Sequence, residues 1–218
     1  MSVLGELQPN KVFKYFEEIC SIPHGSRNLQ QISDYLVDFA KAHELKYRQD
    51  EDLNVIIWKD GSKGYEDSDP VILQGHMDMV AVKESDCDKD MEKEGLDLEI
   101  DGDYILAKGT SLGGDDGIAV AYTLAVLDDE EMAHPPIEAI FTVNEEIGML
   151  GAATIDVSDL KGRLFMNMDS EDEGVFTVSC AGGASVICKI PYETETVNAS
   201  VIEIKMDGFT GGHSGVEI

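Results

Sequence analysis

The sequence predicts an α/β fold, with a mixed, mostly parallel sheet flanked by helices. Short apolar stretches typical of buried strands alternate with longer stretches typical of helices. Residues that can bind a cation or transfer a proton follow several predicted strands, where open α/β sheets bind their ligands. From about residue 174 the pattern becomes β-like alternation. We therefore predict one domain over residues 1–179 and the start of a smaller α+β domain over residues 180–218.

The composition argues against several classes of partner. Lys and Arg number 16 against 44 Asp and Glu, which gives a net charge of −28. Nucleic acids and anionic membranes bind basic surfaces, so neither is expected as a partner. No stretch approaches the roughly 18 apolar residues of a membrane span. The four cysteines form no CxxC pair, and free cysteines fit a reducing cytoplasm.

Two amphipathic helices are predicted at the start of the chain. Residues 10–22 place apolar side chains on one stripe, which Pro23 ends. A second helix follows the loop at residues 24–26, where Asn28 and Gln31 resemble a capping box. The side chains expected on its buried face are Ile32, Leu36, Phe39 and Ala40.

The predicted strands are short and apolar. They cover residues 53–58, 71–76, 137–143 and 163–168. Residues 96–107 resemble a hairpin, whereas the charged residues 83–95 resemble a surface loop. A glycine-rich stretch at 108–117 leads into an apolar helix. It lacks the Gly-Lys-Ser/Thr ending of a phosphate-binding loop, and Asp115 and Asp116 would repel a phosphate.

Ligand-type side chains gather just past the C-terminal ends of these strands. They are His76, Glu145, Glu146 and Asp169, and Asp115 stands where the glycine-rich stretch enters its helix. One histidine with several carboxylates and no cysteine fits zinc, manganese or cobalt at a catalytic site. A core histidine or a solvated Glu-Glu pair would explain each segment alone. Their convergence from several strand ends favours a metal site.

The spacing of these residues indicates two further roles. Asp78 lies two residues after His76, on the same side of an extended chain, so it can reach the ring nitrogen that a metal leaves free. Of the adjacent Glu145 and Glu146, one can bind a metal while the other acts as general base for a metal-bound water. The chemistry expected is hydrolysis of an amide or ester.

Four motifs resemble, in order, those of the di-zinc exopeptidase superfamily of aminoacylases and glutamate carboxypeptidases. They are Gly75-His76-Met77-Asp78, Gly114-Asp115-Asp116-Gly117, Asn144-Glu145-Glu146-Ile147-Gly148 and Asn167-Met168-Asp169-Ser170-Glu171-Asp172. The run at 169–174 and the ending Gly211-Gly212-His213-Ser214-Gly215 resemble the aminoacyl-histidine dipeptidases, also called peptidase D or cytosol non-specific dipeptidase. The resemblance implies a zinc exopeptidase-like catalytic domain followed by the beginning of a lid and dimerisation domain.

The resemblance also implies how two Zn²⁺ ions would be held, with Co²⁺ or Mn²⁺ as substitutes. His76, Asp115 and Asp169 would bind one ion. Asp115 would bridge to the second ion, which Glu146 would bind. The peptide bond between Asp115 and Asp116 is expected to be cis, as in the family.

The remaining roles implied by the resemblance concern catalysis. Glu145 would be the general base and proton shuttle, and Asp78 would orient His76. His213 would steady the scissile carbonyl oxygen in the active site of the partner subunit, so a homodimer formed through the lid domain is expected.

The activity implied is hydrolysis of unblocked dipeptides, including Xaa-His, in the cytoplasm. Family members are longer, and their second zinc takes a further histidine near the C-terminus, whereas no histidine follows His213 here. We therefore expect an N-terminal fragment, whose own activity is left open. Two alternatives also remain: a di-zinc aminoacylase or deacylase on the same scaffold, and a non-catalytic metal-binding remnant.

Overall fold

The computed structural model describes residues 2–170, 174–180, 186–196, 198, 200–206 and 208. The chain divides into two units, Met1–Glu171 and Asp172–Ile218. Every helix and strand that the structure describes lies in the first unit. No helix in the described part of the chain has the length and apolar character needed to cross a membrane.

The first unit is built around a five-stranded sheet with the strand order β1-β2-β6-β3-β7. The strands are β1 (Lys46–Gln49), β2 (Val55–Lys59), β3 (Val71–His76), β6 (Ile137–Thr142) and β7 (Leu164–Asn167). Strand β3 runs parallel to both of its neighbours, β6 and β7, whereas β2 runs antiparallel to β1 and β6. Only β2 therefore opposes the common direction, and the predicted mixed, mostly parallel sheet is confirmed.

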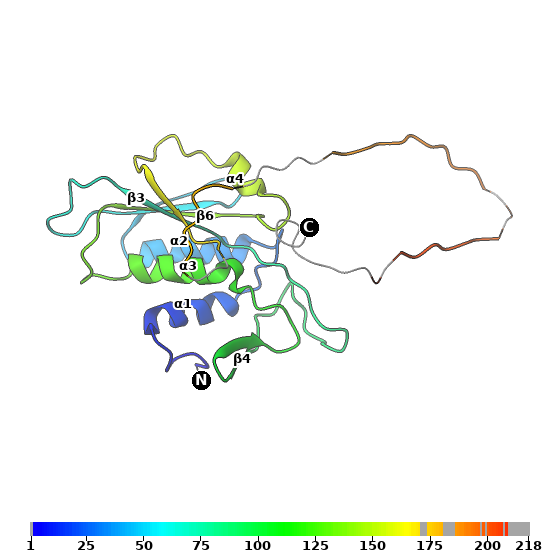
Figure 1. Cartoon of the computed structure of the whole chain (residues 1–218), viewed down its shortest axis with the longest axis horizontal. Helices are drawn as coiled ribbons and strands as arrows, with labels where there is room; N and C mark the ends of the chain where they lie inside the picture. The colour runs from blue at the N-terminus through cyan, green and yellow to red at the C-terminus, as the bar shows by residue number, and fades with distance from the viewer. Residues whose placement is uncertain are drawn as a thin grey trace. The chain divides into compact units, whose positions relative to one another are not determined.

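Three long helices lie on one side of this sheet, and a short helix lies on the other (Figure 1). They are α1 (Asn10–Cys20), α2 (Gln30–Ala42), α3 (Gly114–Leu127) and the short α4 (Leu150–Thr154). Helix α3 packs against β3, α2 packs against β1 and β2, and α1 packs against α3. The helix predicted over residues 10–22, the helix predicted after the loop at residues 24–26, and the helix after the glycine-rich stretch are confirmed.

The side chains of β2 separate the apolar interior into two layers. Val55 and Ile57 belong to the main core with the three long helices, whereas Ile56 between them joins Ile72 and Ile140 on the opposite face. This alternation follows from the period of two along a strand. A sheet covered on both faces explains why its inner strands are apolar runs.

The hairpin predicted over residues 96–107 is confirmed. Strands β4 (Leu98–Asp101) and β5 (Tyr104–Ala107) form a separate antiparallel pair.

The predicted capping box of α2 is wrong. The residue before the helix is Leu29, and no side chain caps the helix. The side-chain amide of Asn28 instead donates to the carbonyl oxygen of Glu92, at 2.9 Å. Because this bond to the charged surface loop engages the Asn28 side chain, Asn28 does not cap the helix.

The β-like strands predicted over 174–190 and 200–206 are also not found in the described parts of those segments. Phe176 and Val178 are 88% and 96% exposed. A strand of a packed sheet needs a buried face, and every described residue of these two segments is exposed. The domain boundary near residue 180 stays a prediction.

Candidate metal centre

Three parallel strands end at the same edge of the sheet. In the register of β3 and β6, His76 lies opposite Thr142, and in that of β3 and β7, Gln74 lies opposite Asn167. Asp169 follows two residues after the end of β7. The fold therefore brings the ends of β3, β6 and β7 together as the sequence predicted.

Three side chains at this edge bring ligand-type atoms together. Atoms of His76, Asp115 and Glu146 all lie within 4.8 Å of one another. The Nε2 atom of His76 is 3.1 Å from Oδ1 of Asp115. The His76 side chain is 1% exposed and that of Asp115 is 65% exposed, so the group is open to solvent on one side. An imidazole nitrogen with two carboxylate oxygens and an open side fits a catalytic-type metal site.

Glu145 and Asp169 lie near this group without belonging to it. The Oε2 atom of Glu145 is 3.9 Å from Nε2 of His76. Among the described residues, Asp169 is not part of the close ligand group. It lines, with Glu145, a cavity of about 280 Å³. The predicted division of ligands between two ions therefore stays a prediction, and His213 lies outside the described residues.

Asp78 contacts His76 through its backbone as well as its carboxylate. The Nδ1 atom of His76 is 3.0 Å from the main-chain oxygen of Asp78 and 3.5 Å from its Oδ1. The predicted approach of the Asp78 carboxylate is present, but the main-chain oxygen is nearer. A proton on Nδ1 shared with these oxygens leaves Nε2 free to bind a metal.

The start of α3 holds the acidic residues against β3. Asp115 and Asp116 have non-helical backbone angles, and the peptide bond between them is cis, as expected. The 2% exposed side chain of Asp116 accepts a hydrogen bond from the backbone N–H of His76 at 3.1 Å. A Cβ atom at Gly75 would lie 2.8 Å from the Asp116 carboxylate, so this contact requires glycine there.

The electrostatics of the site favour binding of a cation. Burial lowers the pKa of His76, but the hydrogen bond with Asp78 and the nearby carboxylates outweigh burial and raise it to about 10. Burial raises the pKa of Asp116 to about 7 against the charge of His76. Burial and then neighbouring carboxylates raise the pKa of Glu145 and Glu146. Groups that hold protons because they are buried beside other carboxylates can exchange those protons for a metal ion.

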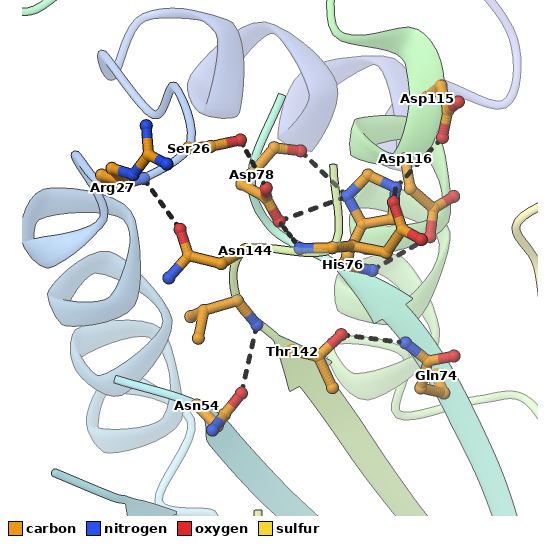
Figure 2. Close-up of polar contacts among 12 residues, drawn as sticks. Ser26, Arg27, Asn54, Gln74, His76, Asp78, Asp115, Asp116, Thr142 and Asn144 are labelled. Atoms are coloured by element: carbon orange, nitrogen blue, oxygen red, sulfur yellow. Dashed lines mark hydrogen bonds and ion pairs between the residues drawn. The ribbon is translucent and has the colours of Figure 1, made fainter. Parts of the chain in front are cut away.

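Sequence reasoning missed the loop between α1 and α2 as part of this site. The hydroxyl of Ser26 donates to Oδ2 of Asp78 at 2.8 Å, across 52 residues of chain. The backbone N–H of Arg27 donates to Oδ1 of Asn144 at 2.8 Å, across 117 residues. Figure 2 shows both contacts beside His76. No local pattern around Ser26 could have indicated partners so distant in the sequence.

Comparison with known proteins supports the resemblance read from the motifs. Over its whole length the chain is 39% identical to the cytosol non-specific dipeptidase of Escherichia coli (strain K12), of which it spans 45%. Its structure is similar to that of aminoacylhistidine dipeptidase from Vibrio alginolyticus, with a TM-score of 0.76 and 41% identity over 78% of this chain and 35% of that chain. No family model matches the chain.

A solved structure with lower sequence identity has a similar fold. A tripeptidase from Staphylococcus aureus is 23% identical with a TM-score of 0.63, covering 77% of this chain and 45% of that chain. The chain therefore shares its fold with this tripeptidase as well as with the aminoacylhistidine dipeptidase. The chain spans less than half the length of each of these three relatives.

Proposed function

We propose that this chain carries the metal site of a dipeptide hydrolase. It is similar over its whole length to a cytosol non-specific dipeptidase and over 78% of its length to an aminoacylhistidine dipeptidase. The observation that supports this most directly is the convergence of His76, Asp115 and Glu146, with ligand atoms within 4.8 Å of one another. The proposed substrates are unblocked dipeptides. The name of the E. coli relative, a cytosol dipeptidase, supports a cytoplasmic location.

The proposed metal content is two Zn²⁺ ions, with Asp169 as a further ligand beside the group of three. Bound metal would polarise a peptide carbonyl and make water more acidic, which is the chemistry that amide hydrolysis needs. On the protein side, His76 presents Nε2 because Nδ1 is engaged by Asp78. Asp115 and Glu146 contribute the carboxylate oxygens of the site.

Glu145 is the proposed general base. Its carboxylate is 3.9 Å from the His76 ring, near the ligands but outside their group. Burial, together with Asp169 and other carboxylates, raises its pKa, which suits a group that accepts a proton and then donates it to the leaving amine. The backbone N–H of Glu145 donates to the buried carboxylate of Asp78 at 3.0 Å, which fixes the start of this segment.

Two further features of the family are proposed for the whole protein. One is a homodimer formed through the lid domain. The other is a role for His213 in steadying the scissile carbonyl oxygen of the partner subunit's substrate. A hydrogen-bond donor at that oxygen would stabilise the negative charge that develops there.

The test is an assay of the whole protein that carries this chain, supplied with Zn²⁺. Free dipeptides should be hydrolysed and N-acyl amino acids should not, and preference for N-acyl amino acids would instead indicate a deacylase. Glu145→Gln should abolish turnover and leave the metal content intact. Glu51→Gln, at an exposed position in a turn, is the matched control and should not change turnover. Retained turnover in Glu145→Gln would refute the proposed mechanism.

A further inference from the structure

The segment at residues 24–27, in the loop between α1 and α2, runs beside the end of β3. The backbone N–H of Met79 donates to the carbonyl oxygen of His24 at 3.2 Å, and the N–H of Ser26 donates to the carbonyl oxygen of Met79 at 3.2 Å. These bonds make Gly25 and Met79 an isolated parallel bridge. A Cβ atom at Gly25 would lie 2.6 Å from Cβ of Ala81, so glycine permits this close approach.

The Ser26 side chain continues this contact toward the metal centre. Its hydroxyl donates to Oδ2 of Asp78 at 2.8 Å, while Oδ1 of the same carboxylate accepts from the backbone N–H of Glu145 at 3.0 Å. Asp78 is 1% exposed, so water competes little for its oxygens. Ser26 thus helps to hold the carboxylate that links the His76 end of β3 to the segment after β6.

A second contact ties the 24–27 segment directly to the chain after β6. The backbone N–H of Arg27 donates to Oδ1 of Asn144 at 2.8 Å (Figure 2). Asn144 has a φ of 54°, in the left-handed region that asparagine tolerates better than most residues. Asparagine at this position therefore supplies both the backbone turn and the acceptor. Glu145 and Glu146 follow immediately.

We propose that Ser26 and Asn144 are positioning residues of the metal centre. Their hydrogen bonds join the 24–27 segment to the chain after β3 and to the chain after β6, and so set the place of Glu145 and Glu146 relative to His76. The inference rests on the proposed function, because it assigns these residues to the metal site of that function. Neither residue is a ligand or a catalytic group. Ser26 acts through the carboxylate of Asp78, and Asn144 acts through the backbone of the segment that carries the glutamates.

A purely structural role would lower stability without changing the metal centre. Ser33 provides the control, because its buried hydroxyl also donates a hydrogen bond to an oxygen distant in the sequence. It donates to the carbonyl oxygen of Leu53 at 2.7 Å, and it is not among the residues that contact the metal centre. Ser33→Ala should therefore destabilise the chain while leaving metal affinity unchanged.

The test is titration of the chain with Co²⁺, followed by visible absorption, with thermal unfolding of each variant measured in parallel. Ser26→Ala and Asn144→Ala should each weaken Co²⁺ binding by about tenfold or more, as loss of groups that orient ligands commonly does. Ser26→Thr keeps a hydroxyl and should restore most of the affinity. Asn144→Gly keeps the left-handed backbone without the acceptor and should remain weakened. Wild-type affinity in Ser26→Ala, or in Asn144→Gly, would overturn the inference.

A dipeptidase assay on the same variants in the whole protein separates this inference from the proposed function. If the wild type hydrolyses no dipeptide but Ser26→Ala and Asn144→Gly weaken Co²⁺ binding, the proposed function fails and the positioning role stands. If the wild type is an active dipeptidase and these two variants bind Co²⁺ as it does, the positioning role fails and the function stands.

Discussion

The backbone N–H of Glu145 donates a hydrogen bond to the carboxylate of Asp78, with 3.0 Å between nitrogen and Oδ1. Asp78 also contacts the ring of His76, so one buried side chain touches both a proposed metal ligand and the proposed general base. The ends of β3 and β6 are therefore coupled by a specific contact in addition to their sheet pairing. A substitution of Asp78 should therefore affect both the end of β3 and the segment that follows β6.

Asp78→Ala is expected to destabilise the metal-free chain. It removes the partner of the Glu145 N–H and of the Ser26 hydroxyl, both on half-buried residues, and hydrogen bonds to a charged group are worth about 1.5–3 kcal/mol each. Urea unfolding in the presence of a chelator would measure the loss. Asp78→Asn keeps one acceptor oxygen and should lose less. Equal unfolding free energies for the wild type and Asp78→Ala would contradict the expectation.

Gly75→Ala should disturb the metal centre from inside the sheet. The new Cβ would lie 2.8 Å from the Asp116 carboxylate and 3.1 Å from Cβ of Ala119, so Asp116 must move from the backbone of His76. Overpacking of this kind costs about 1–3 kcal/mol. Gly114→Ala has 3.8 Å of clearance to the Leu112 side chain and serves as the control. A lower thermal unfolding temperature for Gly114→Ala than for Gly75→Ala would contradict this prediction.

The stability of the metal-free chain should fall as the pH rises. The folded state raises the pKa of His76 from 6.5 to about 10 and that of Asp116 from 3.8 to about 7. In both cases the folded state binds more protons than the unfolded chain, so the stabilisation is full below the ordinary pKa and is lost as the pH rises through the raised one. The free energy of unfolding, measured with a chelator present, should decline between pH 6.5 and 10, and the decline should be smaller in His76→Ala. The same pH dependence of the unfolding free energy in His76→Ala and the wild type would refute this prediction.

Glu138 should control the attachment of β7, and with it the position of Asp169. This carboxylate, 4% exposed, accepts hydrogen bonds from the backbone N–H groups of Lys161 and Gly162 at 2.9 and 2.8 Å. Glu138→Ala should cost about 1.5–3 kcal/mol, as loss of bonds to a buried charged group does, and should speed amide exchange in β7.

The control for Glu138 is Glu99→Ala. Glu99 forms only a partly exposed ion pair with Lys108, at 3.6 Å, which is worth about 0–1 kcal/mol. Unchanged amide exchange in β7 of Glu138→Ala would show that the carboxylate does not hold this strand.

The convergence of the strand ends could be predicted because their sequences are short and mostly apolar. A run such as Ile137–Thr142, buried at every position, is typical of a strand covered on both faces, and parallel strands bring their C-terminal ends to one edge. The same reasoning predicts that His76 and Glu146 lie close together, as the structure shows.

Strand β1 could not be predicted in the same way. Residues Lys46–Gln49 carry only polar and aromatic side chains, and the strand forms because it pairs with β2. The Lys46 ammonium lies 4.5 Å from the centre of the Trp58 ring on that neighbour, a contact invisible to hydrophobic patterning.

The detailed contacts around His76 were beyond sequence reasoning for a different reason. The period of two that places Asp78 on the same side as His76 holds within a strand, but β3 ends at His76. Beyond this point the chain leaves the regular strand. The main-chain oxygen of Asp78 there lies closer to the ring than its carboxylate does. Side-chain bonds across long separations, as from Ser26, leave no periodic signal.

The most direct test of the proposed metal centre compares the adjacent residues Glu145 and Glu146. Zn²⁺ affinity, measured by competition with a chromophoric chelator, should fall strongly in Glu146→Ala, as it should in His76→Ala and Asp115→Ala, because their ligand atoms form one group. Glu145→Ala, outside that group, should bind Zn²⁺ nearly as the wild type does. Failure of the wild-type chain to bind Zn²⁺, or equal weakening by Glu145→Ala and Glu146→Ala, would contradict the assignment.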